Sequence, residues 1–214
     1  MGNITKIDKK GNTIATHPIS SVGNFKGICY IGVGYFAVIQ QVNRDLYLVL
    51  AKLDFSSSVK IIKTLKTLDA LNNPHGVCTD GKFFYVLVQA STLPISGKVF
   101  KLDKKGNTIK IFSLTTGSLL RFRALTFNGK HFFATEIKNN EMWQLDQNFN
   151  LIRTFPLPEN LNRGACFDGV NLWVGGATND DLYCLDYQGN VKNQIMPSAG
   201  NLIGVATDGK YFYL

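Results

Sequence analysis

Four residues whose side chains could bind an anion occupy equivalent places in four related segments of the chain. They are Lys26, His75, Arg123 and Arg163, and an apolar residue, Ile203, holds the fifth place. Each precedes a short apolar run, so all five are expected at the start of a strand. A guanidinium group can hold a carboxylate or a phosphate through two parallel hydrogen bonds. The pattern therefore predicts an anion-binding site, provided that the fold brings these strand ends together.

Polar residues at the ends of other expected strands could complete this site. Gln40, Gln89 and Glu136 each follow an apolar or aromatic run, and we expect them to help orient the ligand. A second interpretation is that the basic side chains turn outward or pair with nearby acids. The acids considered for this pairing are Asp45, Glu136, Asp180 and Asp181. The two interpretations differ in whether the basic charges keep an internal partner.

The segments that carry these residues belong to an internal repeat, which predicts the fold. In each copy, the basic residue or Ile203 is followed by a small residue, Gly or Ala, which we call the anchor. The copy then continues with an apolar run, a tight-turn signal and an aromatic or apolar run. The turn signals are Asp80-Gly81, Asn128-Gly129, Asp168-Gly169 and Asp208-Gly209, with a degenerate Ile31-Gly32 in the first copy. Such dipeptides favour β-hairpins because both central residues can adopt a positive φ.

A second recurring signature completes each repeat unit. A strand-like run ending in Leu-Asp or Ile-Asp precedes a polar turn and a further strand. These runs end at Asp8, Asp54, Asp103, Asp146 and Asp186. The unit is therefore four antiparallel strands, and its anchor positions 27, 76, 124, 164 and 204 are 49, 48, 40 and 40 residues apart. This spacing is typical of one blade of a β-propeller.

The two ends of the chain predict how the ring of blades closes. The last unit supplies two strands, and residues 4–8 and 13–19 carry the third-strand and fourth-strand patterns. We expect the N-terminal strands to pair with the C-terminal hairpin, because an unpaired sheet edge invites aggregation. The predicted fold is all-β: a single five-bladed β-propeller of four-stranded antiparallel blades over residues 1–214. The blades are expected at about 25–70, 74–118, 122–160, 162–200, and 202–214 together with 1–22.

The repeat resembles that of the NHL-like and regucalcin-like β-propellers. The shared features are the small apolar strand, the Asp-Gly turn, the aromatic strand, the Leu-Asp ending and the Gly-Asn turn, and they extend over the whole chain. The resemblance implies that the first strand of each blade lines a central channel, with the residues before the anchors at its mouth. Regucalcin-like lactonases hold a divalent metal in this channel through acidic and amide ligands. Because the matching positions here are cationic, we expect neither a metal nor another cofactor.

Composition and cysteine usage narrow the class of protein further. Lys and Arg number 23 against 15 Asp and Glu, and the net charge of +8 is compatible with an anionic partner. The aromatic residues have the period of sheet packing, so nucleic-acid binding is not expected, and no apolar run is long enough to span a membrane. Three cysteines, Cys29, Cys78 and Cys166, share a repeat position with Thr126 and Ala206, which indicates small packing residues. The lack of a disulfide framework and of a signal peptide favours a cytoplasmic location.

These features predict a non-catalytic binding or interaction module rather than an enzyme. Its partner is expected to be an anionic small molecule or an acidic protein surface at the channel mouth, and no oligomeric state is predicted. One alternative rests on residues 125–136, which resemble the segment bearing the catalytic glutamate of the five-bladed plant-type glutaminyl cyclotransferases. That resemblance implies a general acid or base at Glu136. A further alternative is a ligand-free scaffold fragment of a larger propeller protein.

Overall fold

The computed structural model describes eleven segments of the chain, and every structural statement below concerns them. They are residues 2–19, 24–32, 34–42, 45–53, 59–68, 72–90, 97–114, 120–160, 163–176, 178–197 and 202–214. The regular structure in these segments consists of strands. The search for a helix with the length and apolar character to cross a membrane finds none in them.

Hydrogen bonds join the strands into five antiparallel sheets of four strands each. Sheet 1 contains β3 (Asn24–Gly32), β4 (Tyr35–Val42), β5 (Asp45–Leu53) and β6 (Val59–Leu68). Sheet 2 contains β7 (Asn72–Thr79), β8 (Phe84–Ala90), β9 (Gly97–Leu102) and β10 (Thr108–Leu114). Sheet 3 contains β11 (Phe122–Phe127), β12 (Phe132–Glu136), β13 (Glu141–Leu145) and β14 (Leu151–Pro156). Sheet 4 contains β15 (Gly164–Phe167), β16 (Leu172–Gly175), β17 (Leu182–Leu185) and β18 (Val191–Ile195). The closing sheet contains β19 (Ala206–Thr207), β20 (Phe212–Tyr213), β1 (Gly2–Ile7) and β2 (Thr13–Ile19), in that order.

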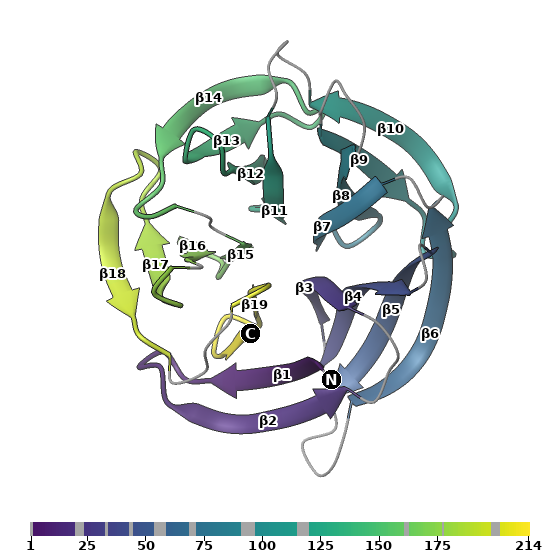
Figure 1. Cartoon of the computed structure of the whole chain (residues 1–214), viewed down its shortest axis with the longest axis horizontal. Coiled ribbons are helices and arrows are strands. Elements are labelled where there is room, and N and C mark those ends of the chain that lie inside the picture. Colours follow the sequence, from purple (N-terminus) through teal and green to yellow (C-terminus); the bar gives the residue numbers. More distant parts are fainter. Residues whose placement is uncertain are drawn as a thin grey trace.

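The sheets are arranged radially around a central axis, which confirms the predicted β-propeller arrangement (Figure 1). The first strand of each sheet is the inner one. Strand β3 contacts β7, β7 contacts β11, β11 contacts β15, β15 contacts β19, and β19 returns to β3. The fourth strands, which include β10 and β14, run along the outer rim (Figure 1). The start of each inner strand therefore lies near the axis, where the sequence analysis places the site.

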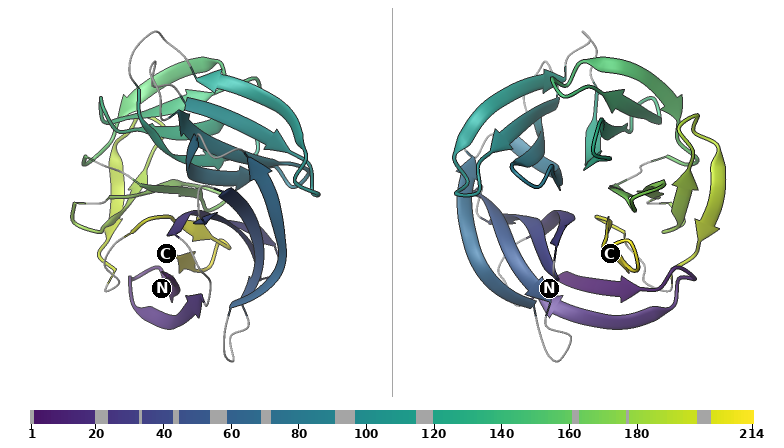
Figure 2. Two further views of the ribbon diagram at one scale, coloured as in Figure 1. Left: turned by 45° about the vertical axis from the view of Figure 1, so that its right-hand side comes forward. Right: turned by 180° about the vertical axis from the view of Figure 1, so that it is seen from behind.

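The closing sheet is built from both ends of the chain, as the repeat predicts. Strand β1 pairs with β20, with Lys6 opposite Tyr213 and Ile7 opposite Phe212. Thr5 and Leu214 exchange two backbone hydrogen bonds of 2.9 Å. The two termini consequently lie close together in both views of Figure 2. Ile7 and Phe212 are fully buried, so the closure also completes a hydrophobic core.

Apolar cores fill the wedges between neighbouring sheets. The largest lies between sheets 2 and 3 and contains Leu87, Val99, Phe132 and Trp143. Four further cores join sheets 1 and 2, sheets 3 and 4, sheet 4 and the closing sheet, and the closing sheet and sheet 1. The strand aromatics are thus core residues, as their alternation predicts. Burial of such side chains contributes on the order of 1.5–3 kcal/mol each, and it fixes the sheets around the axis.

Glycine at the anchor position allows the inner strands to converge. A Cβ atom on Gly27 would lie 2.8 Å from the carbonyl oxygen of His75, and one on Gly76 would lie 2.6 Å from the backbone nitrogen of Leu125. Both distances are shorter than real carbon contacts, so a larger residue would push neighbouring strands apart. The close approach at Gly27 and Gly76 therefore also crowds together the side chains that precede the anchors.

In sheet 2, sheet 4 and the closing sheet, the other end of the inner strand is followed by a tight turn whose aspartate accepts several hydrogen bonds. In sheet 4 the Asp168 carboxylate accepts hydrogen bonds from the backbone N–H of Val170 (2.9 Å) and Asn171 (2.6 Å). It also accepts a 2.8 Å bond from Nε1 of Trp173. Burial by itself would raise the pKa of Asp168, but these hydrogen bonds outweigh it and lower the pKa. Equivalent bonds join Asp80 to Tyr85 and Asp208 to Tyr213.

Candidate functional site

The centre of the candidate site is a hydrogen bond between Arg123 and His75. Atom Nη1 of Arg123 lies 2.9 Å from Nδ1 and 2.8 Å from Nε2 of His75. A guanidinium group can only donate, so the imidazole nitrogen that takes part must accept and the ring must be neutral. Burial is the main cause that lowers the pKa of His75 to about 3, and the charges of Arg123 and Lys26 lower it further. His75 therefore stays neutral across the physiological pH range.

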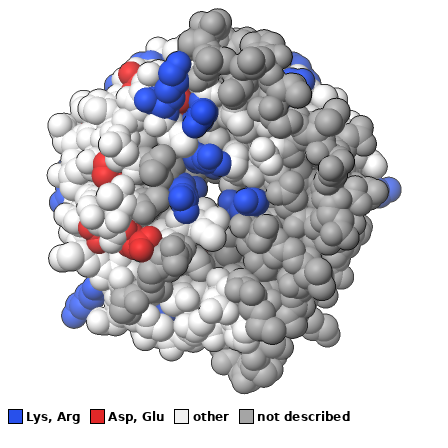
Figure 3. All heavy atoms as spheres, viewed as in Figure 1, with Lys and Arg blue, Asp and Glu red and all other residues white. Residues whose placement is uncertain are grey.

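Four cationic side chains share one electrostatic environment around this pair. The charge of Lys26 acts on His75. Partial burial lowers the pKa of Arg123, and the charges of Arg163 and Arg121 lower it further. Lys and Arg side chains gather around the central opening on the face shown in Figure 3. We call Lys26, Arg121, Arg123 and Arg163, together with His75, the cationic mouth.

Three of the acidic residues considered as partners of the mouth cations accept hydrogen bonds from the backbone or from other side chains. The Glu136 carboxylate is fully buried and accepts backbone hydrogen bonds from Arg121 (2.8 Å), Lys138 (3.0 Å) and Asn139 (2.8 Å). It therefore orders the turn after β12 and offers no exposed oxygen to a ligand. Asp181 accepts bonds from Gln194 and Tyr183, and Asp180 accepts one from the backbone of Leu202. The side chain of Asp45 lies outside the described residues.

The next repeat shows that a carboxylate in this place has a structural function. Gly176 holds the position equivalent to Glu136, and a Cβ atom there would collide with the carboxylate of Glu159. Glu159, which comes from the loop after β14, accepts weak backbone bonds from Thr178 (3.2 Å) and Asn179 (3.3 Å). These two residues are the repeat equivalents of Lys138 and Asn139. Two different glutamates thus close the same turn in neighbouring sheets.

The remaining predicted site residues have separate placements. Gln89 is buried, and its side chain donates to the backbone oxygen of Leu120 and accepts from the backbone nitrogen of Phe122, both at 3.0 Å. It therefore fixes the segment that leads to Arg121 and Arg123. Ile203 is 44% exposed at the fifth position. Gln40 belongs to β4, but its side chain is not among those described.

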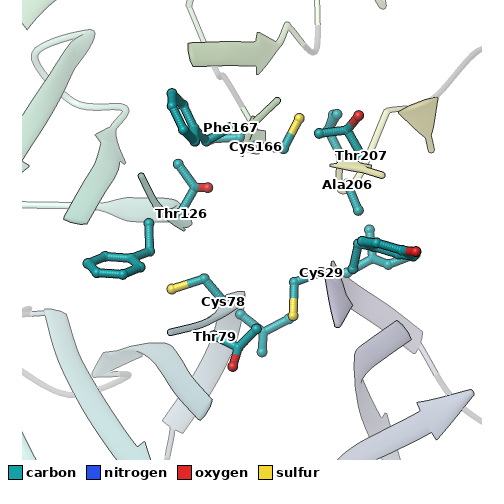
Figure 4. A pocket seen from close by; sticks show the side chains of 14 residues that line it. Cys29, Cys78, Thr79, Thr126, Cys166, Phe167, Ala206 and Thr207 are labelled. Carbon is teal, nitrogen blue, oxygen red and sulfur yellow. The ribbon is translucent and has the colours of Figure 1, made fainter. Parts of the chain in front are cut away.

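Beneath the mouth, the inner strands enclose a small axial cavity of about 80 Å³. Its lining includes Cys29, Cys78, Thr126, Cys166 and Ala206, which are the equivalent small residues of the five repeats (Figure 4). All four cysteines of the chain are free. Burial raises the pKa of Cys29 to about 12, and it also raises the pKa of Cys78 and Cys166, so these thiols are neutral at pH 7. Among the described residues, no group of three His, Cys, Asp or Glu side chains is placed to hold a metal ion.

Arg121 is the component of the mouth that the repeat comparison misses. It lies two residues before Arg123, outside the column of residues that precede the anchors. The sequence contains a signal, because side chains two apart in an extended segment point to the same side. The Arg-Phe-Arg pattern at 121–123 could therefore have indicated a second guanidinium beside the first.

The fold and the cationic mouth define a β-propeller with a charged axial face, and comparison with solved structures supports the fold. The chain is similar to glutaminyl cyclase of Myxococcus xanthus, with 13% identity and a TM-score of 0.73 over 98% of this chain and 91% of that one. It is similar to a luciferin-regenerating enzyme, with 14% identity and a TM-score of 0.59 over 90% of this chain and 69% of that one. A protein of unknown function from Bacteroides caccae gives 12% identity and 0.56 over 89% and 69%. No family model and no curated protein matches the chain, and likeness at these identities shows the fold alone.

Proposed function

We propose that this protein is a binding module, a five-bladed propeller that holds an anionic group at its cationic mouth. The observation that carries the proposal is the charge around His75. The basic side chains of the mouth have no hydrogen bond or ion pair to a carboxylate within the described part of the chain, since Arg121 contacts Glu136 only through its backbone N–H. Unit charges a few ångströms apart near a surface repel by about 1–4 kcal/mol. A bound anion would turn this repulsion into attraction.

The same arrangement supports binding rather than simple solvation of the basic groups. Arg123 is only partly exposed. Burial disfavours its charged form and lowers the pKa of its guanidinium group. A merely solvated arginine would gain by extending into water. The bond to His75 instead holds Arg123 at the axis, where a ligand would meet several cations at once.

Calorimetric titration with sulfate tests this proposal. Wild type is expected to bind sulfate, and Arg163→Gln and Arg123→Gln are each expected to weaken binding at least tenfold. Arg163 is exposed, so its replacement should leave folding intact if Arg123→Gln does not. Lys104→Gln, in an exposed turn after β9, is the matched control and should bind as wild type. Absence of sulfate binding to wild type, or binding by both arginine variants as tight as that of wild type, would overturn the proposal.

A second candidate function is a glutaminyl cyclase-like enzyme that uses Glu136. It is supported by the resemblance of residues 125–136 and by the likeness to the Myxococcus xanthus glutaminyl cyclase over most of both chains. The reaction would join the α-amine of an N-terminal glutamine to its side-chain carbonyl carbon and release ammonia. The three backbone bonds to the Glu136 carboxylate weigh against it, because the group is fully buried and both of its oxygens already accept hydrogen bonds.

Ammonia release from a peptide with an N-terminal glutamine separates the two candidates. The enzyme candidate requires turnover by wild type and its loss in Glu136→Gln, with the variant still folded by circular dichroism. No turnover, or equal turnover by Glu136→Gln, removes this candidate and leaves the binding module.

A further inference from the structure

We propose that the cationic mouth is specific for a multiply charged oxyanion of the phosphate class, as carried by a phosphate monoester or a diphosphate, rather than for a single carboxylate. This inference rests on the proposed function, which requires only that an anion binds. The present step concerns how much charge the anion carries. It follows from the number of cations, the state of the surrounding acids and the hydrogen-bond geometry at Arg123.

The number of cations that act together is the first argument. The charges of Arg121 and Arg163 contribute to the lowered pKa of Arg123. The charges of Arg123 and Lys26 contribute to the lowered pKa of His75. The four groups therefore form one coupled cluster rather than separate surface charges. A monocarboxylate would neutralise one of the four formal charges. A phosphate dianion or a diphosphate would neutralise two or more and would relieve correspondingly more repulsion.

The sign of the charges at the mouth is the second argument, because it disfavours a ligand whose own cation would lie beside His75 and Arg123. A zwitterion such as a free amino acid would need a carboxylate of the protein available for its ammonium group. Glu136, Glu159, Asp180 and Asp181 each accept hydrogen bonds from the chain itself. Exposed acidic side chains lie to one side of the central opening (Figure 3), but the charges that act on His75 and Arg123 at the mouth itself are all basic.

The geometry of Arg123 is the third argument. Its contact with His75 is made through Nη1. No hydrogen bond to Nε or Nη2 is found among the residues that the structure describes, so this edge of the guanidinium keeps its two parallel N–H donors. That pair of donors matches two oxygens of a tetrahedral phosphate. His75 thus acts as a positioning residue that sets the orientation of the Arg123 guanidinium group.

The cavity below limits where the anion can sit. The cavity lining begins about two residues further along each inner strand, at Ile28, Val77 and Ala165. Its thiols are neutral, because burial raises the pKa of Cys78 and Cys166 well above the usual range. No counter-charge is therefore available inside the described part of the channel, and the anion is expected to remain at the mouth.

The test is a charge series measured by calorimetry at constant ionic strength and pH 7.5, with acetate, methyl phosphate and pyrophosphate as probes. We expect methyl phosphate to bind at least fivefold more tightly than acetate, and pyrophosphate at least tenfold more tightly than acetate. Arg121→Gln and Arg163→Gln should each reduce the ratio of pyrophosphate to acetate affinity severalfold. Lys104→Gln should leave the ratio unchanged. Equal affinities for acetate and pyrophosphate in wild type would overturn the inference.

The pH dependence distinguishes a phosphate from a sulfate ester as the source of the charge. The second ionisation of a phosphate monoester has a pKa of about 6, so methyl phosphate gains a charge between pH 5 and pH 7.5, whereas sulfate does not. The groups facing His75 are Arg123 and Lys26, and those facing Arg123 also include Arg121 and Arg163. The imidazole stays neutral over this range, because burial lowers the pKa of His75 to about 3. Methyl phosphate should therefore bind severalfold more tightly at pH 7.5, with sulfate unchanged. A parallel response of the two probes would contradict the inference.

The outcomes also separate this inference from the proposed function. If sulfate, acetate and pyrophosphate bind equally and Arg163→Gln weakens all three, the binding module stands and the charge specificity falls. If none of the probes binds to wild type, both fail.

Discussion

Charged side chains have different partners at the two ends of the inner strands. At the turn end, Asp168 and Asp208 are each bonded to two backbone N–H groups and an aromatic side chain. Two lysines near this end contact aromatic rings: Nζ of Lys6 lies 3.8 Å from the centre of the Tyr211 ring, and Nζ of Lys101 lies 4.0 Å from that of Phe83. At the mouth end, Arg123 is held by a neutral imidazole and surrounded by other cations.

This difference separates charge that serves folding from charge that is available for binding. Both ends belong to the same repeat, so the fold alone does not explain why Arg123 is half-buried among other cations at the mouth, whereas Lys104 at the turn end is exposed to solvent. Functional sites commonly hold groups in environments that cost stability. If that explanation is correct, substitutions at the turn end should lower stability, and charge removal at the mouth should not.

The largest expected effect is at the turn end. Asp168→Ala should lower the free energy of unfolding by about 2–3 kcal/mol, because it leaves the buried Nε1 of Trp173 and two backbone N–H groups without an acceptor. Urea denaturation measures the change. Asp168→Asn is the matched control, since Asn128 caps the equivalent turn of sheet 3, and it should lose less. A loss below 0.5 kcal/mol in Asp168→Ala would contradict the statement that charged groups at the turn end stabilise the fold.

The second prediction concerns the loss of stability at acidic pH, to which His75 at the mouth contributes. His75 has a folded pKa of about 3, below the value near 6.5 of the unfolded chain. Between these values the unfolded state binds more protons, so stability should fall as the pH drops below 6.5. From pH 7 to pH 4.5 this contributes about 2 kcal/mol. His75→Asn should remove that part of the loss in urea titrations, whereas His131→Asn should not. The same pH dependence in wild type and His75→Asn would show that the imidazole is not held neutral.

A smaller effect is expected from removing a charge at the mouth. Arg163→Gln should leave the free energy of unfolding unchanged or raise it by up to about 0.5 kcal/mol, because a like-charge contact with Arg123 is relieved. The same denaturation measurement gives the answer. Destabilisation by more than 1 kcal/mol would indicate that Arg163 serves the fold.

The smallest effect is in the response to salt. Raising NaCl from 0.05 to 0.5 M screens repulsion between the mouth cations and should stabilise wild type by a few tenths of a kcal/mol. The double variant Arg121→Gln/Arg163→Gln should gain less. Salt that affects both proteins equally would mean that the mouth cations do not repel one another measurably.

Local signals made most of the architecture predictable. The Asp-Gly and Asn-Gly dipeptides correctly marked the hairpins, and Gly81, Gly129, Gly169 and Gly209 all have φ between +86° and +97°. The expectation of a positive φ at both central residues is wrong, because the Asp or Asn before each of these glycines does not have a positive φ. The incomplete last unit indicated the pairing of β1 with β20. The alignment of repeat positions also placed Lys26, His75, Arg123 and Arg163 in one column, and the structure brings these four around the axis.

The parts that the sequence could not predict depend on contacts between repeats. Nothing local indicates that Glu159 supplies the carboxylate that Gly176 lacks, because the two residues come from different loops. The roles of Gln89 and Glu136 in holding the segment before β11 are of the same kind. Side chains of this type look like ligand-binding groups in a repeat alignment. Only their burial and hydrogen bonds separate them from the residues of the mouth.

The pairing of β1 with β20 also has a consequence for synthesis on the ribosome. Strands β1 and β2 emerge before the strands of sheets 1 to 4, but the partner of β1 is among the last strands described. Sheets 1 to 4 can each form from consecutive residues as the chain grows, whereas the closing sheet must wait. Until then, one side of β1 has an unpaired edge, a feature that promotes association between chains. The nascent polypeptide is therefore expected to need protection of residues 2–19 until translation has reached β20.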